Sequence, residues 1–141
     1  MKTPNRIFLI DDDVDDGYIF DAALNDASRD CELLYYHDSE QAISRLSDKA
    51  FAPPDMLFID WNMPKMDGNQ CLQMIRKMPG YDKVPIIIYS TSSHPQLQAE
   101  AQKHGASYFL AKPPSIQELT EKLGVLLDRD WQSTSDFTGG V

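Results

Sequence analysis

Residues 7–13 read Ile-Phe-Leu-Ile-Asp-Asp-Asp, a short apolar run that ends abruptly in three acids. Residues 56–60 repeat this arrangement as Met-Leu-Phe-Ile-Asp. Short, continuous apolar runs are typical of strands that are buried on both faces of a sheet. We therefore predict two central strands of a parallel sheet, each followed by a carboxylate at its carboxyl end.

Three further apolar runs have the length of a strand, and segments with helical spacing separate the five runs. The additional strands are expected at 32–37, 86–89 and 107–110. Helices are expected over 18–25 and 116–127, with cap signals at Asp38, Asp67 and Ser115, and with Pro95 and Gly105 bounding a further helix. Five strand–helix units in a row, joined by right-handed crossovers, predict an α/β fold with a doubly wound five-stranded parallel sheet and five helices.

Length and charge restrict the class of protein. A chain of 141 residues favours one domain, which we place at 5–128, followed by a short polar tail at 129–141 without an output domain. The formal net charge of −9 argues against direct nucleic-acid binding and against an anionic membrane surface. The apolar runs are too short for membrane insertion or a signal peptide.

The cysteines and histidines suggest no further chemistry. Cys31 and Cys71 do not form a CxxC pair, so we expect two reduced cysteines and no zinc site. His37, His94 and His104 are scattered along the chain, and neither metal binding nor phosphorelay is expected of them. In the tail, Trp131 and Phe137 could dock on the domain, contact a partner or do nothing.

The polar residues at the strand ends carry the chemistry. In a doubly wound sheet, ligands bind beyond the carboxyl ends of the strands. Asp11 and Asp12, Asp60, Ser90 and Lys112 would meet at that edge. Crowded carboxylates need a cation, and Mg²⁺ fits because it takes few protein oxygens. With a lysine and a hydroxyl beside it, such a site suits phosphoryl transfer, with Asp60 as the nucleophile.

Three segments resemble the receiver domain of bacterial two-component response regulators. They are residues 7–13, residues 60–68 (Asp-Trp-Asn-Met-Pro-Lys-Met-Asp-Gly) and residues 105–113 (Gly-Ala-Ser-Tyr-Phe-Leu-Ala-Lys-Pro). The resemblance covers roughly residues 5 to 128, and the chain is similar to stand-alone receivers such as the chemotaxis response regulator. It implies a flavodoxin-like fold with strand order 2-1-3-4-5.

The resemblance also implies roles for the acids and the lysine. Asp60 is the expected phosphoacceptor. Asp12 would bind Mg²⁺ directly and Asp11 mainly through a water molecule, while Asn62 would offer its backbone carbonyl. Lys112 would pair with Asp60 at rest and with a phosphoryl oxygen afterwards. The Lys112–Pro113 peptide bond is expected to be cis.

Further roles concern switching and the lifetime of the phosphoryl group. Ser90 would hydrogen-bond a phosphoryl oxygen, and Phe109 occupies the position of the switch aromatic ring, which moves inward on activation. Asn62 and Ser92 stand at positions that tune the rate of self-dephosphorylation, and Thr91 could narrow access to Asp60 and slow phosphoryl exchange with a kinase. Thr91 replaces a small residue and is the alternative switch hydroxyl, although position favours Ser90.

Two other departures concern partner contacts. Phe109 replaces the common tyrosine and so lacks its hydroxyl. Pro114 replaces a common phenylalanine on the loop that contacts the kinase, so partner choice could differ.

The resulting hypothesis is a cytoplasmic, single-domain response regulator, monomeric or weakly dimeric. It would accept a phosphoryl group from a sensor histidine kinase or histidine phosphotransfer protein and signal through the face of its fourth helix, fifth strand and fifth helix. It would not be an enzyme acting on other molecules. Alternatives are a phosphorylation-independent interaction module and, less favoured, an aspartyl phosphatase or a flavodoxin-like cofactor carrier. The phosphatase would need an acid where Asn62 stands.

Overall fold

The computed structural model describes residues 4–27 and 30–131. Within them, five parallel strands form one sheet in the order β2-β1-β3-β4-β5. The strands are β1 (Arg6–Ile10), β2 (Glu32–Tyr36), β3 (Met56–Asp60), β4 (Ile86–Ser90) and β5 (Tyr108–Ala111). The predicted doubly wound sheet and its strand order are therefore confirmed.

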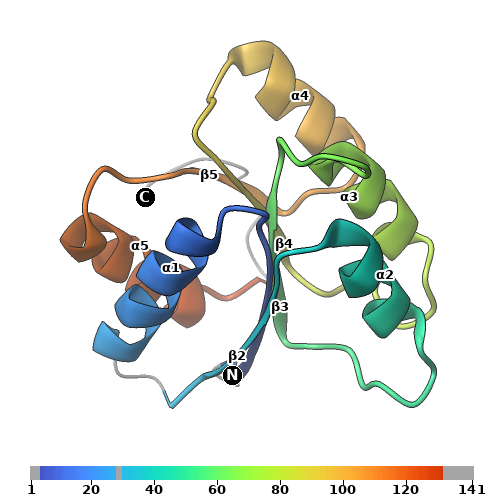
Figure 1. Cartoon of the computed structure of the whole chain (residues 1–141), viewed down its shortest axis with the longest axis horizontal. Helices are drawn as coiled ribbons and strands as arrows, with labels where there is room; N and C mark the ends of the chain where they lie inside the picture. Colours follow the sequence, from blue (N-terminus) through green and yellow to red (C-terminus); the bar gives the residue numbers. More distant parts are fainter. Residues whose placement is uncertain (1–3, 28–29, 132–141) are drawn as a thin grey trace.

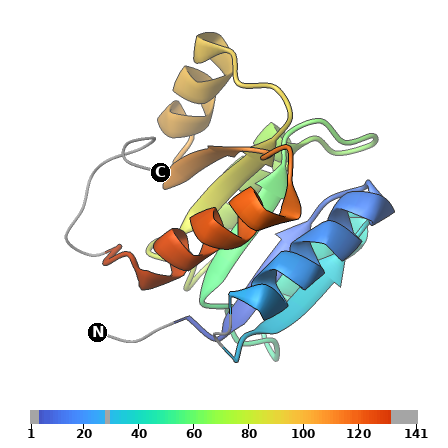
Figure 2. The same cartoon turned by 90° about the vertical axis from the view of Figure 1, so that its left-hand side faces the viewer.

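Five helices cover the two faces of this sheet (Figure 1). They are α1 (Val14–Asp26), α2 (Ser39–Ser47), α3 (Gly68–Arg76), α4 (Pro95–Lys103) and α5 (Ile116–Asp128). Helices α1 and α5 pack side by side on one face, as Figure 2 also shows. Helices α2, α3 and α4 lie on the other face.

Each face of the sheet has its own apolar core, because successive side chains of a strand point to opposite faces. On β1, Phe8 and Ile10 pack under α2 and α3, whereas Ile7 and Leu9 pack under α1 and α5. All residues of β3 and β4 are buried, as expected for the centre of a parallel sheet. This rigid centre fixes the positions of the residues that follow the strands.

Side-chain caps set the beginnings of most helices. Asp67 and Gln70 form a reciprocal capping box at α3, and Asp38 accepts hydrogen bonds from two backbone amides at α2. Ser115 caps α5 by accepting a hydrogen bond from the backbone amide of Glu118. Helix α1 begins at Val14, four residues before the start expected from apolar spacing, because Asp13 caps it by accepting from the amides of Asp15 and Asp16.

The end of the described chain docks on the domain. The ring of Trp131 meets Tyr108 edge-on with 6.1 Å between ring centroids, and its Nε1 donates to the carbonyl of Leu126 at 3.1 Å. Phe137 and the rest of the expected tail beyond residue 131 lie outside the described residues. Within the described residues, no helix has the length and apolar character needed to cross a membrane.

Candidate functional site

Residues that end or follow four neighbouring strands gather at one edge of the sheet. Asp11 follows β1, Asp60 and Ser90 end β3 and β4, and Lys112 follows β5. Asp11 and Ser90 are fully buried, and Asp60 is 6% exposed. Polar side chains are rarely buried to this extent without partners, so this edge of the sheet is the candidate site.

Three carboxylates form the acidic part of the site. Oxygens of Asp11, Asp12 and Asp60 all lie within 4.8 Å of one another, and Asp12 is exposed whereas the other two are buried. Oδ1 of Asp11 accepts from the amide of Asp13 at 3.0 Å. Oδ2 of Asp11 is buried without a well-directed hydrogen bond, although the Lys112 ammonium lies 2.9 Å away.

This set of oxygens fits Mg²⁺, the metal expected from the crowded carboxylates. Mg²⁺ is bound by one or two carboxylates together with waters, and an incompletely satisfied, buried carboxylate oxygen is a suitable ligand. Asp11, Asp12 and Asp60 are the residues that would hold it. Asn62, whose backbone carbonyl is an expected further ligand, is an exposed residue on the loop after β3.

Lys112 is the cation of the site. Its side chain is 9% exposed, and Nζ lies 2.7 Å from Oδ2 of Asp16, 2.9 Å from Oδ2 of Asp11 and 3.7 Å from Oδ1 of Asp60. It also lies 5.1 Å from the centroid of the Tyr89 ring. The expected pair with Asp60 is thus present, but it is the longest of the three ion pairs.

Burial and mutual charge shift the titration of these groups. Burial, followed by the charge of Asp11, raises the pKa of Asp60 to about 7. Burial likewise raises the pKa of Asp11, although Lys112 opposes the shift. Burial alone would lower the pKa of Lys112, but its hydrogen bond to Asp16, its close contact with Asp11 and the negative charges of Asp11 and Asp60 together outweigh burial and raise that pKa. The structure therefore disfavours the ionised forms of Asp11 and Asp60 and favours the protonated form of Lys112.

The two residues assigned to switching lie on the same face of the sheet. Ile88 pairs with Phe109 and Ser90 with Ala111, so Ser90 and Phe109 are diagonal neighbours on adjacent strands. Oγ of Ser90 accepts from the amide of Ser92 at 3.1 Å. Phe109 is 5% exposed and packs in the core beneath α3 and α4. In this structure the ring is therefore inward.

Two of the remaining positions are exposed. Thr91 follows β4 with an exposed side chain, and Pro114 is exposed on the loop between β5 and α5. Thr91 and Pro114 are therefore both accessible to a partner protein.

The expectation of a cis peptide bond at Lys112–Pro113 is wrong for this structure. Its described residues contain no cis peptide bond. Proline reduces the preference for trans to about 0.5–1 kcal/mol without removing it, so the motif alone does not fix the isomer.

Two polar contacts of the site have no signal in the sequence. Asp16 lies in the first turn of α1, yet its carboxylate accepts from Lys112, 96 positions further along the chain. Tyr35 on β2 was assigned no role, yet its hydroxyl donates to the carbonyl of Asp11 at 2.7 Å. No local sequence signal pairs residues so far apart.

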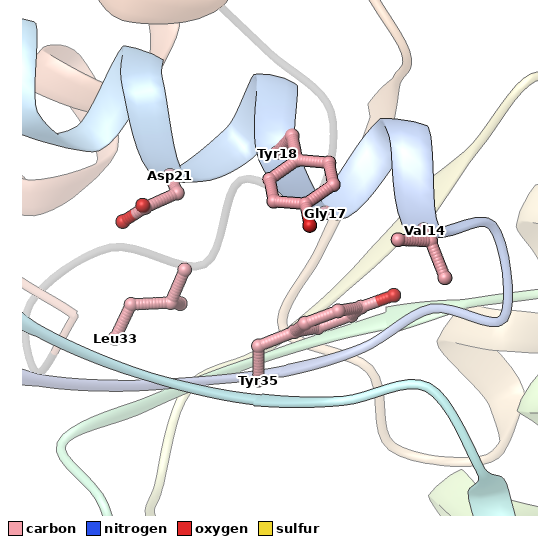
Figure 3. Close-up of a pocket in the computed structure, with 6 residues that line it drawn as sticks. All are labelled: Val14, Gly17, Tyr18, Asp21, Leu33 and Tyr35. Atoms are coloured by element: carbon pink, nitrogen blue, oxygen red, sulfur yellow. The ribbon is translucent and has the colours of Figure 1, made fainter.

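A groove runs beside this second contact, between α1 and β2 (Figure 3). It has a volume of about 250 Å³ and is lined by Val14, Gly17, Tyr18, Asp21, Leu33 and Tyr35. Figure 3 shows the Tyr35 ring lying beneath Gly17, where the helix has no side chain. A smaller groove of about 160 Å³ opens beside Asp12, next to the loop that carries Lys65.

Comparison with known proteins agrees with this geometry. A family model of the response regulator receiver domain matches residues 7–124, most of the chain. The chain belongs to this family. The receiver domain is a signalling domain of two-component systems. Receiver domains of response regulators partner with histidine kinases or phosphotransfer proteins.

Relatives of different lengths share this domain. The chain is 29% identical over 114 residues to the probable chemotaxis protein CheY of Rhizobium etli, an alignment that covers 81% of the chain and 85% of the relative. It is 28% identical over 128 residues to the DNA-binding dual master transcriptional regulator RpaA of Synechocystis. That alignment covers 88% of the chain but 49% of the relative, so the chain spans about half of that regulator.

Solved structures share the fold. The chemotaxis response regulator CheY4 of Vibrio cholerae superposes with a TM-score of 0.73 at 26% identity, covering 86% of this chain and 97% of that one. A receiver domain from Rhodospirillum rubrum gives a TM-score of 0.77 at 19% identity, with coverage of 86% and 90%. The receiver fold is thus established by topology as well as by sequence.

Proposed function

We propose that this receiver domain accepts a phosphoryl group on Asp60 from a phosphohistidine of a sensor kinase or phosphotransfer protein, in a Mg²⁺-dependent reaction. The observation that carries the proposal is that Asp60 lies near two further carboxylates and a buried ammonium group. Oxygens of Asp11 and Asp12 lie within 4.8 Å of an Asp60 oxygen, and Nζ of Lys112 lies 3.7 Å from Oδ1 of Asp60. The ammonium group, together with a cation held by the carboxylates, would neutralise charge around a phosphoryl group on Asp60.

The transfer itself needs little from the protein beyond position and charge. An oxygen of Asp60 forms a bond to phosphorus while the phosphorus–nitrogen bond of the donor histidine breaks, and the electron pair of that bond returns to the imidazole. Lys112 would hydrogen-bond a phosphoryl oxygen. Mg²⁺, held by the three carboxylates, would supply further charge neutralisation to the phosphoryl oxygens.

Signalling would follow from the relation of Ser90 to Phe109. Ser90 would turn its hydroxyl from the Ser92 amide, now 3.1 Å away, toward a phosphoryl oxygen. Because Ser90 and Phe109 share a face of the sheet, that shift would change the packing between β4, β5 and α4. The surface of α4, β5 and α5 would then favour a different downstream partner, by a shift between two pre-existing states.

The test is intact mass spectrometry after incubation with acetyl phosphate, with and without Mg²⁺. Wild type should gain one phosphoryl group only when Mg²⁺ is present, and Asp60→Asn should gain none. Asp82→Asn is the matched control, because Asp82 is an exposed acid on the loop before β4, away from the carboxyl ends of the strands. Phosphorylation of Asp60→Asn to the wild-type extent would refute the proposal.

The same experiment tests the alternative of a phosphorylation-independent interaction module. Trp61 adjoins Asp60, so its fluorescence should report Mg²⁺ binding. No adduct together with a Trp61 signal that ignores Mg²⁺ would favour the interaction module. No adduct with a responding Trp61 would indicate blocked access, and Thr91→Ala would then be the variant to test.

A further inference from the structure

The shortest ion pair of Lys112 involves a residue outside the acid cluster. Its Nζ lies 2.7 Å from Oδ2 of Asp16, closer than to Asp11 at 2.9 Å and 1 Å closer than to Asp60 at 3.7 Å. Asp16 stands in the first turn of α1, whereas the carboxylates of the cluster follow β1 and end β3. Lys112 is thus drawn toward α1.

The environment makes this ion pair stronger than an ordinary surface pair. The Lys112 side chain is 9% exposed and the Asp16 side chain 26% exposed. Exposed pairs contribute little because water and salt screen them, and this screening is weaker for a partly buried, hydrogen-bonded pair. Asp16 therefore competes with Asp60 for the ammonium group of Lys112, which the proposed reaction needs.

We propose that Asp16 is a positioning residue that holds the ammonium of Lys112 beside Asp60 rather than on it. The inference rests on the proposed function of Asp60 as phosphoacceptor. It assigns to Asp16 two opposite effects on two steps, one on metal binding and one on phosphoryl binding.

The first effect is to favour the metal. Without Asp16, the ammonium would be left to Asp11 and Asp60, two of the carboxylates that would hold Mg²⁺. It would then compete with the metal for their oxygens and repel it. Asp16 offers the ammonium a counter-charge away from the cluster, so both cations can occupy the pocket.

The second effect is to oppose the phosphoryl group. Lys112 would contact a phosphoryl oxygen on Asp60, and the movement of its Nζ away from Asp16 would lengthen and weaken their hydrogen bond. Weakening a charge-assisted hydrogen bond costs free energy that the new contact has to recover. Asp16 therefore weakens the binding of a phosphoryl group in a pocket that already contains Mg²⁺.

Asp16→Asn tests both effects, and Asp15→Asn is the matched control. Asp15 is the preceding residue, exposed in the same first turn, so its loss removes the same charge and the same interaction with the helix dipole. In Mg²⁺ titrations followed by Trp61 fluorescence, Asp16→Asn should bind the metal about tenfold more weakly, the scale of one charge-assisted hydrogen bond. Asp15→Asn should change the affinity by less than about twofold, because exposed charges are screened.

The phosphoryl step is measured with beryllofluoride, a phosphoryl analogue, at saturating Mg²⁺. Asp16→Asn should bind beryllofluoride several-fold more tightly than wild type and Asp15→Asn. Asp16→Glu keeps the carboxylate and should stay close to wild type in both titrations. A variant with a merely disturbed fold would weaken both ligands, so the opposite signs identify a positioning role.

Thermal unfolding of each variant shows whether it is folded, and Asp16→Ser gives the same test should Asp16→Asn not fold. Equal behaviour of Asp16→Asn and Asp15→Asn, or weaker binding of both ligands, would overturn the inference. Its failure is distinguishable from that of the proposed function, because the latter is decided by whether wild type forms a Mg²⁺-dependent adduct on Asp60.

Discussion

The ring of Tyr35 lies directly against the backbone of Gly17, at a distance that leaves no room for a side chain. A Cβ atom at Gly17 would stand 2.6 Å from Cζ of Tyr35. Glycine inside a helix costs roughly 1 kcal/mol relative to alanine, so this position sacrifices helix stability for the close approach of a ring. The ring in turn carries the hydroxyl that donates to the carbonyl of Asp11.

Gly17→Ala should therefore destabilise the protein, although alanine is the better helix former. Overpacking of a filled site costs about 1–3 kcal/mol, more than the helix propensity returns. Urea unfolding should show a lower midpoint with an unchanged slope. In a Tyr35→Leu background, which removes the ring, the same substitution should become neutral or stabilising. A stabilising effect in the presence of Tyr35 would mean that the ring moves aside without cost.

Tyr35→Phe tests whether the hydroxyl orders the acidic loop. The hydroxyl donates to the carbonyl of Asp11 at 2.7 Å, and burial raises the pKa of Tyr35 to about 12, so it remains a donor at neutral pH. The variant should lose about 1 kcal/mol of stability. It should also bind Mg²⁺ a few-fold more weakly in Trp61 titrations, because the loop that holds Asp11 and Asp12 becomes less ordered.

Tyr18→Phe is the control for this effect. Tyr18 lines the same groove, but it is 71% exposed, so the loss of its hydroxyl should change neither stability nor Mg²⁺ affinity. Equal Mg²⁺ affinities for Tyr35→Phe and wild type would show that the loop is ordered by its other contacts alone.

The placement of the acid cluster follows from features that the sequence displays directly. Continuous apolar runs that end in Asp11 and Asp60 define central strands, and parallel strands bring their carboxyl ends to one edge. Helix caps are equally local, since Asp67 and Gln70 are three positions apart. Fold and acid cluster could therefore be predicted, because each step depended on a pattern within a few residues.

The contacts that orient the cluster could not be predicted in this way. Asp16 and Lys112 are 96 positions apart in the sequence, and Tyr35 is 24 positions from Asp11, whose carbonyl it contacts. Each depends on the exact distance between a helix and the sheet beneath it, which apolar spacing does not specify. The early start of α1 had a local cause, the cap at Asp13, but polar residues in a first turn give no apolar signal.

Arg76 is expected to be a major determinant of stability, although it lies outside the candidate site. Its guanidinium donates to the carbonyls of Gly105, Tyr81 and Val84 at 2.8, 2.6 and 2.8 Å, and to Oγ of Ser107 at 3.1 Å. These bonds tie α3 to the loops before β4 and β5. Arg76→Met would leave several carbonyls without a donor and should cost about 3 kcal/mol or more in urea unfolding.

Arg45→Met is the matched control, since Arg45 is an exposed arginine on α2 that lies over the Phe51 ring at 4.6 Å. Its loss should cost about 1 kcal/mol or less. Similar losses for the two arginines would show that water replaces the buried hydrogen bonds of Arg76 without penalty.

Cys71 should make the protein less stable at alkaline pH. Burial, with a smaller effect from Asp67, raises the pKa of its thiol from 9.0 to about 12. The unfolded chain loses this proton near pH 9 while the folded chain retains it, so the unfolded state gains favour as pH rises from about 9 to 12. Below this range the thiol contributes no pH dependence.

The drop in unfolding free energy between pH 7.5 and 10 should therefore be smaller for Cys71→Ala than for wild type. The lower baseline stability of the variant, which follows from the cavity it creates, cancels in that difference. Drops of equal size would show that the folded protein releases the thiol proton as easily as the unfolded chain.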